Sequence, residues 1–267
     1  MLIKHLNADS KIAILVDVDT DGYTSSALLF NYITFMMEPG RPWEMYGGEI
    51  VPVFHKDKTH GLGDTDVMKR LRDEIKPNLL IIPDASGTEE QCAALVALGI
   101  DILIIDHHDM EFRGDKESVV VINNQQSERY LNKDLSGVGV VFQFCCMLDS
   151  ALGWDAAGQW LDLVACGMVG DMMNLKSRET RFLIFQGLNN INSYLLQFYK
   201  FTAYSMQGKE YNPHAISFYI APMVNAVCRL GTQEEKELLW KAFIDIYAED
   251  EIENGTRGHK GEMVPLV

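Results

Sequence analysis

Three absences limit what this chain can be. Only five cysteines occur in 267 residues and none forms a CxxC pair, which argues against a disulfide framework and favours a reducing cytosol. No apolar run approaches the roughly 18–20 residues of a membrane helix, and the first residues lack a signal-peptide core, so we expect a cytoplasmic protein without membrane contact. Basic residues are also scarce, whereas domains that bind duplex DNA by charge are usually basic.

The acidic residues are unevenly distributed. The chain holds 23 Lys and Arg against 38 Asp and Glu, a net charge of −15. Residues 232–253 contain eight of these acids and two lysines, and several others cluster directly after apolar runs. The excess of acidic residues can therefore reflect carboxylates that bind cations. A composition of 47% hydrophobic and 23% charged residues is typical of a globular protein.

Short apolar runs alternate with helical patterns in the first 125 residues. Continuous aliphatic character is typical of strands buried on both faces of a parallel sheet. We therefore predict a doubly wound, mainly parallel five-stranded α/β sheet flanked by helices and followed by a helical subregion. The expected strands are Ile12–Val16, Glu49–Phe54, Leu79–Ile82, Ile102–Ile105 and Val119–Ile122. The expected helices are Tyr23–Met37, Thr65–Ile75, Thr88–Leu98, Ser136–Leu152, Ala157–Val169, Arg178–Asn189, Ile191–Phe198 and Gln233–Tyr247.

An acidic motif, Asp17-Val-Asp-Thr-Asp-Gly22, follows the first predicted strand. Ligands of open parallel sheets bind beyond the carboxyl ends of the strands. Alternate residues of an extended segment point to one side, so Asp17 and Asp19 can present carboxylates to one crevice. Asp21 suits a turn or a helix cap. A solvated acidic turn is the alternative, and a calcium-binding EF-hand is disfavoured because its later Glu is missing.

More potential ligands follow the other predicted strands. Asp84 ends one apolar run, Asp106-His107-His108 ends the next, and Asp171 closes an apolar helical segment. Carboxylates with histidine suit manganese, iron or zinc, and Asp106 or Asp109 could orient the imidazoles. A helix cap or boundary residue is the alternative for Asp84 and Asp171. Together these groups suit two divalent ions of the kind that activate water against a phosphoryl group.

In this order the motifs resemble those of the DHH phosphoesterase superfamily. Within it, the chain is similar to the RecJ-like single-stranded-DNA exonucleases over about residues 12–245. The similar segments are Val16–Ser25, Val121–Gln125, Leu135–Phe142 and Val224–Gly231. The resemblance implies Mn²⁺ or Mg²⁺, with two ions, held by Asp17, Asp19, Asp84, His107 and Asp171. Asp84 would bridge the ions, and Asp84, His107 and His108 would be the catalytic residues. His108 would either support a metal ligand or face the phosphate.

One departure from the family pattern concerns the first metal site. Related proteins have a histidine two or four residues before the first Asp of the acidic motif, where this chain has Leu15 and Ala13. We therefore expect one metal site to bind its ion weakly.

Substrate contacts are expected from a loop and from a later segment. Lys56, Lys58 and His60 lie in a Gly-containing loop where cationic groups could contact phosphates, although a solvated loop is equally compatible. Asn225 and Arg229 match a RecJ-like segment, and Arg229 could bind phosphate or form a structural ion pair.

The resemblance implies 5′→3′ hydrolysis of single-stranded DNA to mononucleotides. The alternatives are a DHH phosphodiesterase for short oligoribonucleotides or cyclic dinucleotides, an inorganic pyrophosphatase, and a non-catalytic recombination or replication module. Single-strand-binding or replication proteins are implied as partners.

The same resemblance divides the chain into two parts. Residues 1–230 would form the DHH catalytic domain, and residues 231–267 a connecting helix and linker, with Asn254–Gly261 as the linker. They would lead towards a second, C-terminal domain absent from this chain.

Overall fold

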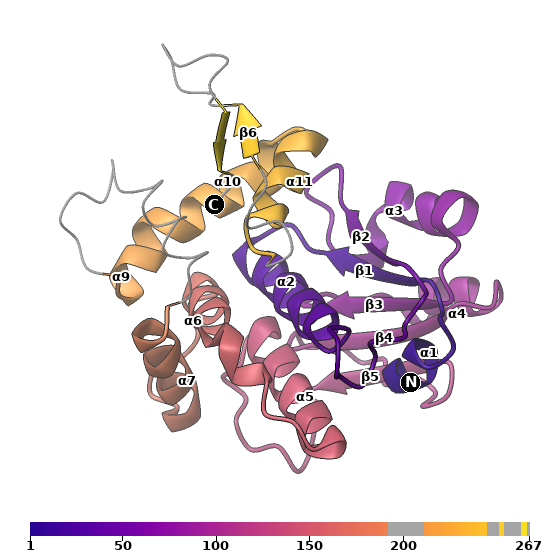
Figure 1. Ribbon diagram of the computed structural model, residues 1–267, viewed down its shortest axis with the longest axis horizontal. Helices are drawn as coiled ribbons and strands as arrows, with labels where there is room; N and C mark the ends of the chain where they lie inside the picture. Colours follow the sequence, from indigo (N-terminus) through magenta and orange to yellow (C-terminus); the bar gives the residue numbers. More distant parts are fainter. Residues whose placement is uncertain (192–210, 245–250, 254–262, 266–267) are drawn as a thin grey trace.

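The computed structural model of the protein describes residues 1–191, 211–244, 251–253 and 263–265. At its centre lies a parallel sheet with the strand order β2–β1–β3–β4–β5 (Figure 1), which confirms the predicted fold class. The strands are β1 Ile12–Val16, β2 Ile50–Phe54, β3 Leu79–Pro83, β4 Asp101–Asp106 and β5 Val119–Asn123. In this order the direction of strand addition reverses between β1 and β3, and ligands of such sheets bind at that switch point.

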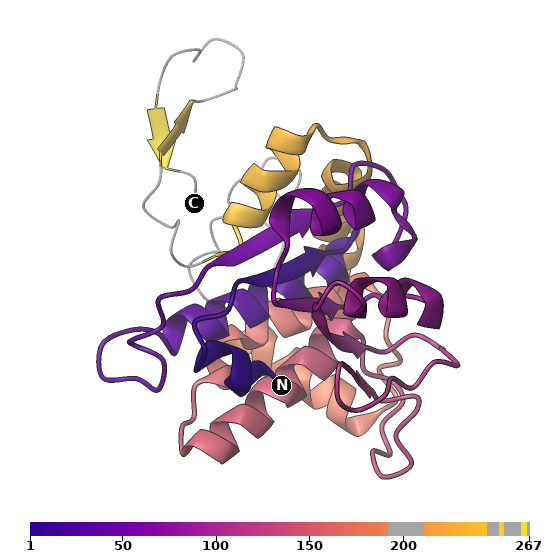
Figure 2. The same cartoon turned by 90° about the vertical axis from the view of Figure 1, so that its right-hand side faces the viewer.

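Helices cover both faces of the sheet (Figures 1 and 2). One face packs against α1, α2 and α5, with α6 packed on α2 and α5, and the other face packs against α3 and α4. These helices are α1 Leu2–Leu6, α2 Thr20–Phe35, α3 Thr65–Arg70, α4 Glu89–Val96, α5 Gly137–Leu152 and α6 Leu161–Gly170. A π-helical turn, Leu71–Ile75, extends α3.

The apolar runs in the strands are uninterrupted because the sheet is buried on both faces. In β1, Ile12, Ile14 and Val16 belong to the core under α2 and α5. Ala13 and Leu15 point the other way, into the core under α3 and α4, and neither is exposed. The two positions at which the family pattern led us to expect a histidine are therefore filled by core side chains that cannot reach the sheet edge.

The second half of the chain packs onto the α2 side. It contains α7 Arg178–Asn189, α9 Pro213–Ala215, a π-helical turn Ile216–Ile220, α10 Ala221–Leu230 and α11 Gln233–Lys241. In α11, Trp240 is buried, packs edge-on against Phe30 and Phe54, and donates its indole N–H to Ser26 Oγ at 3.0 Å. The predicted connecting helix is thus anchored on the sheet domain.

Some predictions and observations do not overlap. Most of the helix expected at Ile191–Phe198 and the linker expected at Asn254–Gly261 lie outside the described residues. The α9–α10 region and an antiparallel pair, β6 Glu251–Glu253 with β7 Met263–Pro265, were not predicted. All five cysteines are free. Within the described ranges, no helix has the length and apolar character needed to cross a membrane.

Candidate metal centre

The strand-end carboxylates and histidines converge at the switch point of the sheet. Asp17 follows β1, Asp84 follows β3, and His107 follows β4, while Asp171 is the first residue after α6. Parallel strands end at one edge of a sheet, and β1 and β3 are neighbours. Asp17, Asp84 and His107 are all buried. The structure therefore brings together the five residues expected to hold metal, although in two separate clusters.

The first cluster surrounds the end of β1. Asp17, Asp19 and His60 each offer a ligand atom, and these atoms all lie within 4.8 Å of one another. His60 Nδ1 lies 2.6 Å from Asp17 Oδ2. Asp19 is the N-cap of α2 and accepts a hydrogen bond from the Gly22 amide at 3.0 Å. His60, which the sequence suggested as a phosphate contact, therefore lies among the carboxylates.

The second cluster surrounds His107. Its Nε2 atom lies 3.3 Å from Asp84 Oδ1, 3.5 Å from Asp171 Oδ2 and 3.9 Å from an oxygen of Asp21. Among the described residues, neither Nε2 nor Asp84 Oδ1 has a hydrogen-bond partner, although both atoms are buried. Buried polar atoms without partners are costly, and a bound cation would satisfy them. The donor set of imidazole and carboxylates fits a divalent transition metal.

The carboxylates of the second cluster resist ionisation without a cation. Burial and the charges of Asp21 and Asp19 raise the pKa of Asp84 well above its usual value. Burial, with the same two neighbours, raises the pKa of Asp171 to about 7. Burial also raises the pKa of Asp19. A bound cation reverses such shifts by compensating the negative charge.

Asp106 supports the histidine pair from behind. It is fully buried, and its Oδ1 atom accepts hydrogen bonds from the His107 amide at 2.7 Å and from His108 Nδ1 at 2.8 Å. That hydrogen bond from His108, and the charge of Asp106, raise the pKa of His108 to about 9. His108 is therefore an imidazolium at neutral pH, with a side chain 58% exposed. Of the two aspartates that could orient the imidazoles, Asp106 does so, and Asp109 is exposed.

Asp21 caps a helix, as the sequence suggested, but that helix is distant in the chain. It caps α5 rather than only its own turn, because its carboxylate accepts hydrogen bonds from Ser136 Oγ at 2.8 Å and the Gly137 amide at 2.6 Å. These contacts hold the start of α5 against the second cluster. A Cβ at Gly137 would lie 2.3 Å from Asp84 Oδ1, so this position requires glycine.

Two of the five predicted substrate contacts line a small cavity beside the clusters. Asn225 and Arg229 share a cavity of about 100 Å³ with Asp19 and Asp171. Asn225 Oδ1 accepts hydrogen bonds from the Thr20 amide and hydroxyl at 2.8 Å, so it also fixes the start of α2. The Arg229 guanidinium donates to the Val18 carbonyl at 3.4 Å.

The loop after β2 contributes differently from what was expected. Lys58 is exposed. Lys56 forms a 2.8 Å ion pair with Asp66. Only His60 of this loop's predicted contacts reaches the centre. His55, which sequence reasoning did not select, is also buried beside Asp17.

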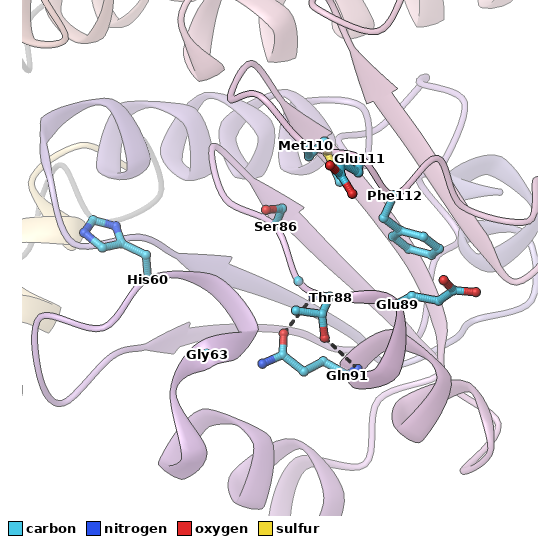
Figure 3. A pocket seen from close by; sticks show the side chains of 10 residues that line it. His60, Gly63, Ser86, Thr88, Glu89, Gln91, Met110, Glu111 and Phe112 are labelled. Carbon is cyan, nitrogen blue, oxygen red and sulfur yellow. Dashed lines mark hydrogen bonds between the residues drawn. The ribbon is translucent and has the colours of Figure 1, made fainter.

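A larger cavity extends from His60 along the carboxyl edge of the sheet. It has a volume of about 740 Å³, and Figure 3 shows His60 on one side with Met110 and Phe112 across from it. A neighbouring cavity of about 320 Å³ is lined by His60, Asp84 and His108 among others. The volumes are in the range of small-molecule sites.

Comparisons with known proteins agree with the observed fold. The sequence model described as the DHH family, N-terminal domain, matches residues 11–168. The putative SPbeta prophage-derived single-strand DNA-specific exonuclease YorK of Bacillus subtilis is 35% identical over 91% of this chain. The single-stranded-DNA-specific exonuclease RecJ of the same organism is 28% identical over 84%. The crystal structure of Thermus thermophilus RecJ in complex with Mn²⁺ matches 91% of this chain with a TM-score of 0.71 and 23% identity.

The matches cover only part of each relative. The chain spans 40% of the length of YorK, 27% of B. subtilis RecJ and 33% of the T. thermophilus structure.

Proposed function

The chain belongs to the DHH family, and we propose that it is a metal-dependent phosphodiesterase that hydrolyses single-stranded DNA in the manner of RecJ. The similarity to two single-strand-specific exonucleases supports this substrate. By the same resemblance, the proposed polarity is 5′→3′ and the proposed products are mononucleotides.

One observation carries the proposal. His107 Nε2 and Asp84 Oδ1 lie 3.3 Å apart, buried and without hydrogen-bond partners among the described residues. The first cluster, around Asp17, lies at the end of β1, which pairs with β3, the strand that precedes Asp84. We therefore propose that Asp17, Asp19, Asp84, His107 and Asp171 hold two divalent ions, Mn²⁺ or Mg²⁺, with Asp84 between them.

Each residue has a defined part in this chemistry. When bound, divalent ions lower the pKa of water and neutralise charge on phosphoryl oxygens. Asp106 fixes the ring of His108 and keeps it protonated, so that His108 can donate a hydrogen bond to the phosphate or a proton to the leaving oxygen. The exposed guanidinium of Arg229, beside Asp19 and Asp171, can bind a non-bridging phosphate oxygen.

A cleavage assay distinguishes this function from its alternatives. The purified chain is incubated with a single strand labelled at either end, the matching duplex, a short RNA and a cyclic dinucleotide, each with Mn²⁺ or with EDTA. We expect mononucleotides from the single strand only, released from its 5′ end, and no product with EDTA. Faster hydrolysis of RNA or the cyclic dinucleotide would favour a different DHH phosphodiesterase. A Mn²⁺-loaded, folded chain that cleaves none of them would indicate a non-catalytic module.

A further inference from the structure

A second strand supplies an imidazole where β1 has none. In the parallel pairing of β1 with β2, Val16 is the partner of Phe54. The next residues, Asp17 and His55, therefore follow the ends of two neighbouring strands and lie side by side. The His55 side chain is 0% exposed, and its Nε2 atom lies 3.5 Å from Asp17 Oδ1. This Nε2 atom has no hydrogen-bond partner in the described part of the chain.

The other nitrogen of His55 fixes which atom carries the proton. Nδ1 lies 3.1 Å from Asp64 Oδ2, and an ionised carboxylate can only accept a hydrogen bond. The Asp64 carboxylate is itself held by the Asp66 amide at 2.8 Å, where it caps α3. In the neutral ring Nδ1 is therefore the donor, and Nε2 presents a lone pair towards Asp17. Metal-binding histidines commonly donate their second N–H to a carboxylate in this way.

His60 lies next to the other carboxylate oxygen of Asp17. Its Nδ1 atom lies 2.6 Å from Asp17 Oδ2, and Asp19 lies within 4.8 Å. The loop is fixed here because the Gly61 amide donates to Asp17 Oδ1 at 3.3 Å. Gly61 has a φ of +55°, and a Cβ there would lie 2.0 Å from the Ser86 carbonyl oxygen, so glycine lets the loop close over the site.

We infer that His55, through Nε2, and His60, through Nδ1, are ligands of the ion held by Asp17 and Asp19. The two side chains replace the histidine expected at positions 13 or 15, which Ala13 and Leu15 fill with core side chains. This inference rests on the proposed function only in assuming that the centre binds divalent metal. Two imidazoles make this site a nitrogen-rich one, which favours a transition metal such as Mn²⁺ over Mg²⁺.

Metal titrations test the inference without relying on activity. Mn²⁺ is titrated calorimetrically into the metal-free chain and into the variants His60→Asn and His55→Gln. His214→Asn is the matched control, because His214 lies in α9 and belongs to neither metal cluster. We expect each variant in the β2–α3 segment to weaken one Mn²⁺ site by at least about tenfold. The control should bind as the wild type does.

A spectroscopic readout identifies the ligand atoms directly. In a His107→Asn background, electron spin echo modulation from ¹⁴N should still be present on bound Mn²⁺, and it should disappear when His55 and His60 are also replaced. His60 is partly exposed, so His60→Asn is expected to fold even if His55→Gln does not. Unchanged Mn²⁺ affinity in folded His60→Asn, together with no ¹⁴N signal in the His107→Asn background, would overturn the inference.

The two proposals fail in different ways. A wild-type chain that loses a Mn²⁺ site in these variants but cleaves no nucleic acid would contradict the proposed function alone. A wild-type chain that cleaves single strands with Mn²⁺, while the histidine variants bind Mn²⁺ normally, would contradict only the assignment of His55 and His60.

Discussion

His107 Nε2 lies 3.3 Å from Asp84 Oδ1, and both atoms are buried without a hydrogen-bond partner in the described part of the chain. The two residues come from neighbouring strands, β4 and β3. Asp84 has a φ of +58°, a left-handed conformation that Asp and Asn tolerate better than other non-glycine residues. An isosteric test of this carboxylate is therefore Asp84→Asn.

Asp84→Asn should have opposite effects on metal-dependent activity and on metal-free stability. We expect hydrolysis to fall by at least about a hundredfold, because a carboxylate that would hold the divalent ions is lost. The metal-free chain should become about 1–2 kcal/mol more stable to urea, because a buried, repelled carboxylate is removed. Added Mn²⁺ should stabilise the variant less than the wild type. Near wild-type hydrolysis by the folded variant would contradict the role of Asp84.

The contribution of Asp171 to stability should fall as the pH rises, opposite to that of most carboxylates. The pKa of Asp171 is about 7 in the folded chain, against an ordinary value of 3.8. Between about pH 4 and pH 7 Asp171 therefore binds a proton in the folded state but not in the unfolded state, so its contribution to stability falls as the pH rises through this window.

Urea unfolding from pH 5 to pH 8 in EDTA measures this effect as the difference between wild type and Asp171→Asn. We expect the wild type to lose stability relative to the variant as the pH rises. Saturating Mn²⁺ should abolish that loss, because metal binding favours the ionised carboxylate. A difference that stays constant across this range in EDTA would show that Asp171 ionises normally.

Gly137→Ala should damage the centre although alanine usually stabilises a helix. The added Cβ would lie 2.3 Å from Asp84 Oδ1, so we expect a loss of about 1–3 kcal/mol in stability and weaker Mn²⁺ binding. Gly158→Ala is the control, because no atom lies within 4 Å of its added Cβ. Equal stabilities and Mn²⁺ affinities for the two variants would rule out close packing at Gly137.

His108 should act on the rate rather than on metal binding. We expect His108→Gln to bind Mn²⁺ normally and to lower kcat by about 10²–10⁴-fold, the usual contribution of a proton donor. Wild-type activity should decline as the pH rises above about 9, where His108 loses its proton. Asp106→Asn should move this decline to lower pH, because it removes the carboxylate that holds the proton. An unchanged pH profile in Asp106→Asn would contradict this coupling.

Much of the centre was predictable because its signals are local. Asp17, Asp84 and His107 each follow an apolar run, and the ends of parallel strands necessarily share one edge of a sheet. That rule does not specify the partners of each side chain. It therefore predicted the candidate ligands as one group, whereas the structure divides them between a group around Asp17 and two groups that share His107.

The remaining features depend on contacts that are distant in sequence. His55 reaches Asp17 only through the register of β1 with β2, and Asp21 caps a helix that begins 116 residues later. Nothing in the immediate sequence of either residue signals those contacts. The pairing of β6 with β7 is likewise absent from the hydrophobic pattern, because each strand has only three residues.

The central claim is that the carboxyl edge of this sheet holds two divalent ions. The most direct measurement is an anomalous difference map at the manganese edge from crystals of the chain grown with Mn²⁺. We predict two peaks, one in contact with Asp17 and Asp19 and the other in contact with His107 and Asp171, with Asp84 between them. A map from well-ordered crystals with no peak at either cluster would contradict the account.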